Sequence, residues 1–67
     1  MKYYVNTDAG DDGVHTVHAE DCQFLPNEDS RTALGDYAKC ETAMDHARDE
    51  FSKVDGCSTC ASDCHSG

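Results

Sequence analysis

The sequence predicts a small α+β domain stapled by a metal ion, with two or three short antiparallel strands and one main helix at about residues 39–52. A chain of 67 residues allows one domain, residues 1–67, and buries only about 60% of its unfolded surface, so its core needs a further source of stability. An apolar stripe at helical spacing predicts the helix, and β-prone runs predict the strands. Two Cys/His pairs at metal-ligand spacing predict the metal site that would supply this stability.

Two β-prone runs near the start of the chain predict a hairpin. Residues 2–6 and 14–18 are rich in Tyr, Val and Thr, which favour strands. Between them, residues 8–13 hold two glycines that can adopt positive φ, as a turn requires. Residues 19–31 are polar and contain proline, which predicts a loop, and residues 32–37 form a candidate third strand.

The helix is the clearest predicted element. Apolar side chains recur three or four residues apart and form one stripe, whereas charged residues fill the other sides. Asp36 is the expected N-cap by residue type, and Asp55-Gly56 is expected to end the segment with C-cap and turn chemistry. The stripe consists of Cys40, Ala43, Met44, Ala47, Phe51 and Val54.

The charge and hydropathy of the chain disfavour several classes of function. Five Lys and Arg against fourteen Asp and Glu give a net charge of −9, which opposes binding to nucleic acid. The longest apolar runs are two or three residues, whereas a membrane span needs about twenty. Asn6 and Asp8 come too early for the apolar region of a signal peptide. We therefore expect a cytoplasmic protein that does not enter a membrane.

The acidic residues are scattered along the chain, and ten of the fourteen are Asp. An ordinary solvated surface accounts for them. Adaptation to a high-salt cytoplasm, where self-repulsion is screened, is the alternative.

Two ligand pairs predict the metal site: His18-x3-Cys22 and Cys57-x2-Cys60. In a reducing cytoplasm a Cys cluster indicates first a metal or catalytic site, and five cysteines cannot all pair within one chain. Thiolate and imidazole are the usual ligands of Zn²⁺, and structural zinc sites are closed and four-coordinate. We therefore expect one Zn²⁺ on His18, Cys22, Cys57 and Cys60, joining the hairpin to the end of the helical segment.

Three further candidate ligands are Cys40, Cys64 and His65. Cys40 is on the apolar stripe and is expected to be a buried core thiol; a disulfide with Cys64 or entry into the metal site are the alternatives. Cys64 and His65 lie near the C-terminus, where chains fray. Replacement of His18 by Cys64 or His65 as fourth ligand is the main rival assignment.

These motifs resemble the metal-binding domain of Ada-type DNA-repair proteins and its stand-alone relatives. The resemblance covers about residues 14–60: H-x3-C, a Leu-Gly-Asp-Tyr strand, a helix with Ala-x3-Ala, and C-x2-C. It implies the fold and one zinc ion, with the ligands carried over to His18, Cys22, Cys57 and Cys60. The family has Cys where this chain has His18, and an imidazole cannot be a thiolate methyl acceptor. The resemblance therefore does not extend to methyl transfer.

The expected function is non-catalytic binding to a partner protein, because a closed four-ligand site leaves no position for a substrate. An acidic surface suits a basic partner. Aromatic anchors are available, although core positions are the more ordinary role for them: Tyr3, Tyr4, Phe24 and Tyr37.

The alternative function is a thiol-based redox switch or metal-responsive switch. In it, oxidation of Cys40, Cys57, Cys60 and Cys64 would eject the metal and unfold the chain.

Overall fold

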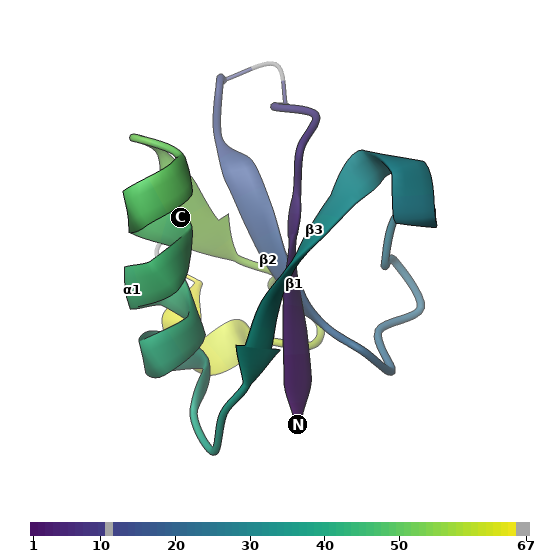
Figure 1. Ribbon diagram of the computed structural model, residues 1–67, viewed down its shortest axis with the longest axis vertical. Helices are drawn as coiled ribbons and strands as arrows, with labels where there is room; N and C mark the ends of the chain where they lie inside the picture. The colour runs from purple at the N-terminus through teal and green to yellow at the C-terminus, as the bar shows by residue number, and fades with distance from the viewer. Residues whose placement is uncertain (11, 66–67) are drawn as a thin grey trace.

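A four-stranded sheet and one α-helix make up the fold (Figure 1). The computed structural model describes residues 1–10 and 12–65. This part of the chain confirms the predicted α+β class, but it contains four strands rather than two or three. The elements are β1 (Lys2–Asn6), β2 (His15–Ala19), β3 (Arg31–Asp36), α1 (Cys40–Glu50) and β4 (Val54–Gly56), with single 3-10 turns η1 (Glu28–Ser30) and η2 (Ser62–Cys64).

The sheet has the strand order β3-β1-β2-β4. β1 pairs antiparallel with β2, as the predicted hairpin requires, and antiparallel with β3 on its other side. The expectation of antiparallel strands alone was wrong, because β4 pairs parallel with β2. A parallel neighbour needs a long crossover connection, and the segment containing β3 and α1 provides it.

The predicted turn between β1 and β2 is present. Gly13 has a φ of +78°, the left-handed conformation that glycine adopts without strain. The backbone N–H of Gly10 donates to the carbonyl of Val14 at 3.0 Å, which brings the two strands together. Asp11 of the predicted turn lies outside the described residues.

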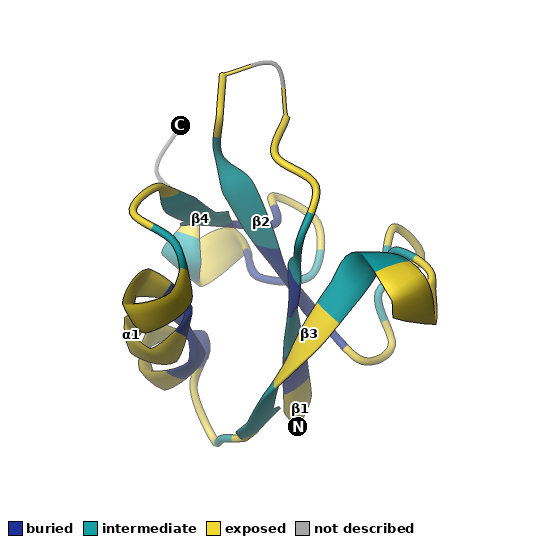
Figure 2. Ribbon diagram, turned by 45° about the horizontal axis from the view of Figure 1, so that its top comes forward, coloured by how far each residue is buried: buried dark blue, intermediate teal, exposed yellow. Residues whose placement is uncertain are grey.

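The core lies between α1 and the sheet (Figure 2). Alternate residues of β1 and β2 point toward it, as the period of a strand requires. The largest fully buried side chains are only Val5 and Val17, so this core supplies little apolar burial. The helix contributes Cys40, Ala43, Met44 and Ala47, and the strands contribute Tyr3, Val5, Val17 and Ala19.

The helix is shorter than predicted. Asp36 is not the N-cap of the helix. The Asp36 carboxylate accepts a hydrogen bond from the N-terminal ammonium at 2.8 Å, and Asp36 is still part of β3. The chain bends at Ala38 and Lys39 before the helix begins, and Lys39 is the observed N-cap. Phe51 leaves the helical conformation at the other end, so residues 51 and 52 are not helical. At eleven residues, α1 is too short to cross a bilayer, and no other helix in the described ranges could do so.

The segment Asp55-Gly56 is strand rather than turn. β4 pairs His15 with Val54 and Val17 with Gly56, and the backbone N–H of His15 donates to the carbonyl of Lys53 at 2.9 Å. The free edge of β2 supplies hydrogen-bonding partners that outweigh the local turn preference of Asp-Gly. This strand leads directly into the Cys57-x2-Cys60 motif.

Candidate metal centre

The parallel pairing of β2 and β4 brings the two predicted ligand pairs together. Because parallel strands end at the same edge of the sheet, His18 on β2 lies beside Cys57, which follows β4. The backbone N–H of Cys57 donates to the carbonyl of Val17 at 2.9 Å and fixes this arrangement. A turn after β2 adds Cys22, whose N–H donates to the carbonyl of Ala19 at 3.1 Å. Two strand ends and their following turns therefore position the ligands.

The distances between the ligand atoms fit a tetrahedral metal site. The Sγ atom of Cys22 is 3.6 Å from Nδ1 of His18 and 3.9 Å from Sγ of Cys57, and Sγ of Cys60 is 3.9 Å from the same Nδ1. Bonds of about 2.3 Å to sulfur and 2.0–2.1 Å to nitrogen, at tetrahedral angles, place the ligand atoms about 3.5–3.8 Å apart. All four ligand atoms lie within 4.8 Å of one another, so this group is placed to hold a metal ion.

The Cys57-x2-Cys60 turn directs backbone donors at a sulfur. Burial acts to raise the pKa of the Cys57 thiol, but the backbone N–H groups of Cys60 and Thr59 point at its sulfur, and the pKa is lowered overall. The turn therefore favours the thiolate, which is the form that binds a metal. Hydrogen bonds from backbone N–H groups also orient such ligands.

Without a cation, the surroundings of Cys60 disfavour its thiolate form. Burial, together with a hydrogen bond to the Cys22 thiol, raises the pKa of Cys60 to about 12, although the backbone N–H of Ala19 donates to its sulfur at 3.3 Å. Clustered thiols cannot all lose their protons without a positive charge between them, and a divalent cation supplies that charge.

His18 is held in the form that coordinates metals. Its side chain is 6% exposed, and burial lowers its pKa, so the imidazole is neutral at physiological pH. Strand alternation turns it away from Val17 and Ala19, its core-facing neighbours on β2. The His18 side chain therefore lies away from the core face of the sheet, beside the cysteines.

Cys40 and Cys64 form a disulfide and are not part of this group. The expectation that Cys40 is buried is confirmed, but the expectation of a free core thiol was wrong. The bond joins the start of α1 to η2 and holds Cys64 in an ordered turn, rather than in a frayed tail. The free cysteines of the described chain are the three that the ligand pairs predict, Cys22, Cys57 and Cys60.

His65 also lies apart from the four-residue group. Its Nδ1 is 3.0 Å from the carbonyl oxygen of Gly56 and 3.2 Å from the carboxylate of Asp55. With Cys64 in the disulfide, the rival assignment that replaces His18 by Cys64 or His65 has no support from the geometry.

Comparison of the chain with protein-family models, with curated proteins and with solved structures finds no match. The resemblance to the Ada-type metal-binding domain therefore stays a prediction.

Proposed function

We propose that the chain is a small structural-zinc module whose metal centre orders a surface that binds a partner protein. The observation that supports it best is the near-tetrahedral spacing of one imidazole nitrogen and three sulfurs. Zn²⁺ is the ion that most often takes such Cys/His sets in closed structural sites. Four protein ligands leave no position for a substrate, so the proposed role is not catalytic.

The metal would stabilise a fold that has little core. His18 and Cys22 flank the end of β2, whereas Cys57 and Cys60 follow β4. An ion on all four would fix the three-residue edge strand β4 to the hairpin. Metal-binding free energy then becomes folding free energy.

The proposed partner-binding surface is the loop between β2 and η1, residues 20–27. Phe24 is 58% exposed, whereas Tyr3 is buried in the core and Tyr37 is half-buried. Acidic residues flank Phe24 on both sides in the sequence. An exposed aromatic ring among negative charges suits a basic peptide segment that carries an apolar side chain. These acidic residues are Glu20, Asp21, Glu28 and Asp29.

The same loop contains Cys22, which gives the metal a direct effect on the surface. Coordination through Cys22 would anchor the loop and reduce the entropy lost when a partner binds. Binding of the partner should therefore depend on bound metal.

Elemental analysis of protein purified without added metal tests the zinc centre. We expect one zinc ion per oxidised chain. Cys57→Ser should lose the ion, whereas Ser58→Ala, an exposed change in the same turn, should keep it. A Cys57→Ser variant that retains both metal and fold would refute the assignment.

Binding to a panel of basic peptides, with and without a central aromatic or aliphatic residue, tests the surface. Metal-loaded protein should bind the apolar-containing basic peptides, and Phe24→Ala should weaken binding while it keeps the metal. The matched control is Gln23→Ala, because Gln23 is an exposed neighbour of Phe24. Equal binding by Phe24→Ala and wild type would contradict the proposed surface.

A thiol-based switch is the second candidate, and the Cys40–Cys64 disulfide is the observation that favours it. Of the four cysteines in the predicted switch, Cys40 and Cys64 form the disulfide, whereas Cys57 and Cys60 belong to the group placed to hold a metal ion. Mild oxidation of metal-loaded protein distinguishes the two functions. The predicted switch would release its metal as Cys57 and Cys60 are oxidised, whereas a structural zinc centre would retain the metal.

A further inference from the structure

A second group of ligand atoms lies at the start of α1, outside the proposed zinc centre. It consists of the sulfurs of Cys40 and Cys64 and the carboxylate of Glu41, all within 4.8 Å of one another. In the structure the two sulfurs are joined, so this group holds a disulfide beside a carboxylate. If the disulfide is reduced, the same atoms become two thiols and a carboxylate, which are ligands for a divalent metal ion.

The backbone spacing suits either state. The Cα atoms of Cys40 and Cys64 are 6.3 Å apart, within the range of about 4.4–6.8 Å for disulfides. Two thiolates on one zinc ion need their sulfurs about 3.8 Å apart, given bonds of about 2.3 Å. Rotation of the two side chains can open the sulfurs to that distance while the backbone stays in place.

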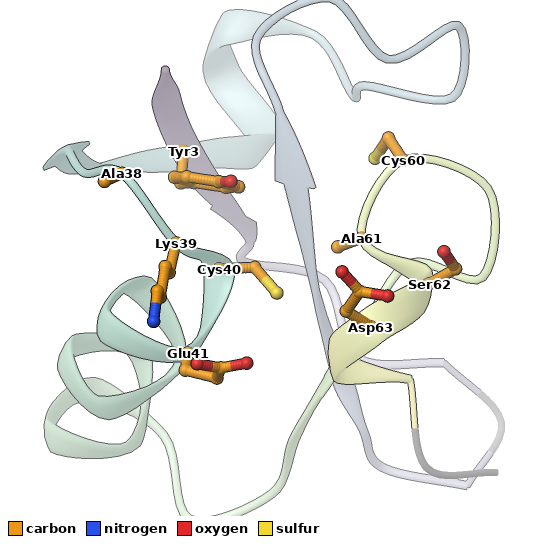
Figure 3. A pocket seen from close by; sticks show the side chains of 9 residues that line it. All are labelled: Tyr3, Ala38, Lys39, Cys40, Glu41, Cys60, Ala61, Ser62 and Asp63. Atoms are coloured by element: carbon orange, nitrogen blue, oxygen red, sulfur yellow. The ribbon is translucent and has the colours of Figure 1, made fainter.

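Two members of the group, Cys40 and Glu41, line a pocket of about 300 Å³ between the start of α1 and the 60–63 segment. Figure 3 shows the sulfur of Cys40 turned into this pocket, with the carboxylate of Asp63 opposite it and that of Glu41 below. The ammonium group of Lys39 is directed away from that sulfur. An ion on Cys40, Cys64 and Glu41 would therefore meet solvent on its fourth side.

The local electrostatics favour anionic ligands at this position. Cys40 is the first residue of α1, where the unpaired N–H groups and the helix dipole produce a positive potential. The N-cap Lys39 makes no side-chain capping bond, so its side chain does not satisfy these N–H groups. Two thiolates and Glu41 in the first turn place negative charge there, and a divalent cation balances it.

We propose that Cys40, Cys64 and Glu41 form a second site for a thiophilic divalent cation such as Zn²⁺ or Cd²⁺, available only when the Cys40–Cys64 disulfide is reduced. The metal capacity of the chain then follows the redox state of this pair: one ion when it is oxidised and two when it is reduced. In a reducing cytoplasm, where disulfides do not persist, the second site would be the prevailing form.

The chemical step is thiol–disulfide exchange followed by metal binding. A dithiol donor gives two electrons and two protons to the disulfide; the S–S bond of the pair breaks, and the donor closes its own disulfide. The incoming M²⁺ then displaces the two thiol protons into solvent as it forms two metal–sulfur bonds. Reoxidation by a disulfide oxidant restores the bond and expels the cation.

The test counts metal ions per chain in two redox states of the full chain. One sample is kept oxidised and the other is treated with a phosphine, which is oxidised to its oxide with water as the oxygen source. A thiol assay should then find three free thiols and five free thiols, respectively. Both samples are equilibrated with Zn²⁺, desalted and analysed. We expect one ion per oxidised chain and two per reduced chain.

The Cys40→Ala/Cys64→Ala variant should bind one ion under both conditions. Glu41→Gln should bind its second ion more weakly when reduced, whereas Glu50→Gln, at the far end of α1, is the matched control. A reduced wild type with only one ion would overturn the proposal. A double variant that gains a second ion on reduction, or a disulfide that the phosphine cannot reduce in the folded protein, would overturn it as well.

Cadmium spectroscopy gives a readout that does not depend on stoichiometry alone. The ultraviolet Cd–thiolate charge-transfer absorption should increase on reduction, as the number of bound thiolates rises from three to five. An unchanged absorption contradicts the second site. Failure of the proposed zinc centre is recognisable separately: the oxidised chain would then bind no ion, and reduction would still add one.

Discussion

The disulfide between Cys40 and Cys64 should provide a large part of the stability of this chain. Its two cysteines are 24 residues apart in sequence. In the loop-entropy account, a cross-link of this span removes about 3.5 kcal/mol of conformational freedom from the unfolded chain at 25 °C. Native domains are stable by only about 5–15 kcal/mol, and a core whose largest fully buried side chains are two valines belongs near the lower end. Loss of the bond should therefore bring the protein close to unfolding.

Urea unfolding of Cys40→Ala/Cys64→Ala against the oxidised wild type measures this effect. Both proteins carry one equivalent of Zn²⁺, and the double variant is used because it cannot form the proposed second site. We expect a loss of about 3–4 kcal/mol in the free energy of unfolding and a melting temperature lower by about 15–25 °C. Wild type with an alkylated pair is not a suitable substitute, because the added groups would not fit around buried Cys40.

A difference below about 1 kcal/mol would refute the reasoning. It would mean that the metal centre or residual structure already restrains the 57–64 segment in the unfolded chain, so that the cross-link removes little entropy. The same measurement on the single variants should give nearly the same loss as the double variant, because either change alone breaks the bond.

Four other outcomes test the packing, the metal centre and the surface. Val17→Ala should cost about 2 kcal/mol by urea unfolding, since it removes two buried carbons from a fully buried side chain. Gly56→Ala should cost about 1–3 kcal/mol of stability and weaken zinc binding. The added Cβ would lie 2.8 Å from the carbonyl oxygen of Ala61 and 2.8 Å from backbone and Cβ atoms of Cys64. An unchanged zinc affinity would contradict this prediction. Burial lowers the pKa of His18, so the unfolded chain takes up a proton first as the pH falls. The free energy of unfolding of the metal-free protein should therefore be full above about pH 6.5, the pKa of a free imidazole, and should decline below it. An unfolding free energy that stays constant between about pH 7.5 and 5.5 would exclude this contribution. If the net charge of −9 reflects a high-salt environment, the urea midpoint should rise with KCl from low to molar concentration, whereas a midpoint independent of salt would leave an ordinary solvated surface.

The four residues that are placed to hold a metal ion could be predicted from the sequence because each pair is a local motif. His18-x3-Cys22 and Cys57-x2-Cys60 each need only one turn to bring two ligands together. That the two pairs meet depends on the parallel contact between β2 and β4, which local patterns do not show. Cys60-x3-Cys64 has the same spacing as the first pair, so the sequence left a rival combination open, and the Cys40–Cys64 disulfide removes it.

The features that were missed depend on partners distant in sequence. Asp55-Gly56 has the composition of a turn, and only the exposed edge of β2 makes it a strand. Asp36 has the residue type of an N-cap, but the N-terminal ammonium takes its carboxylate. Cys40 fits the apolar stripe whether or not it is bonded, so a disulfide to Cys64 remained only one of several possibilities.

The parallel contact between β2 and β4 also has a kinetic consequence. Val17 and Gly56 pair although they lie 39 positions apart in the chain, so β4 can join the sheet only after a large loop has closed. The hairpin and α1 rest on shorter-range contacts and can form earlier. An ion would find only His18 and Cys22 in such an intermediate. Capture of the ion by all four ligands should therefore mark the final step of refolding, at a rate that becomes independent of zinc concentration once docking of β4 is limiting.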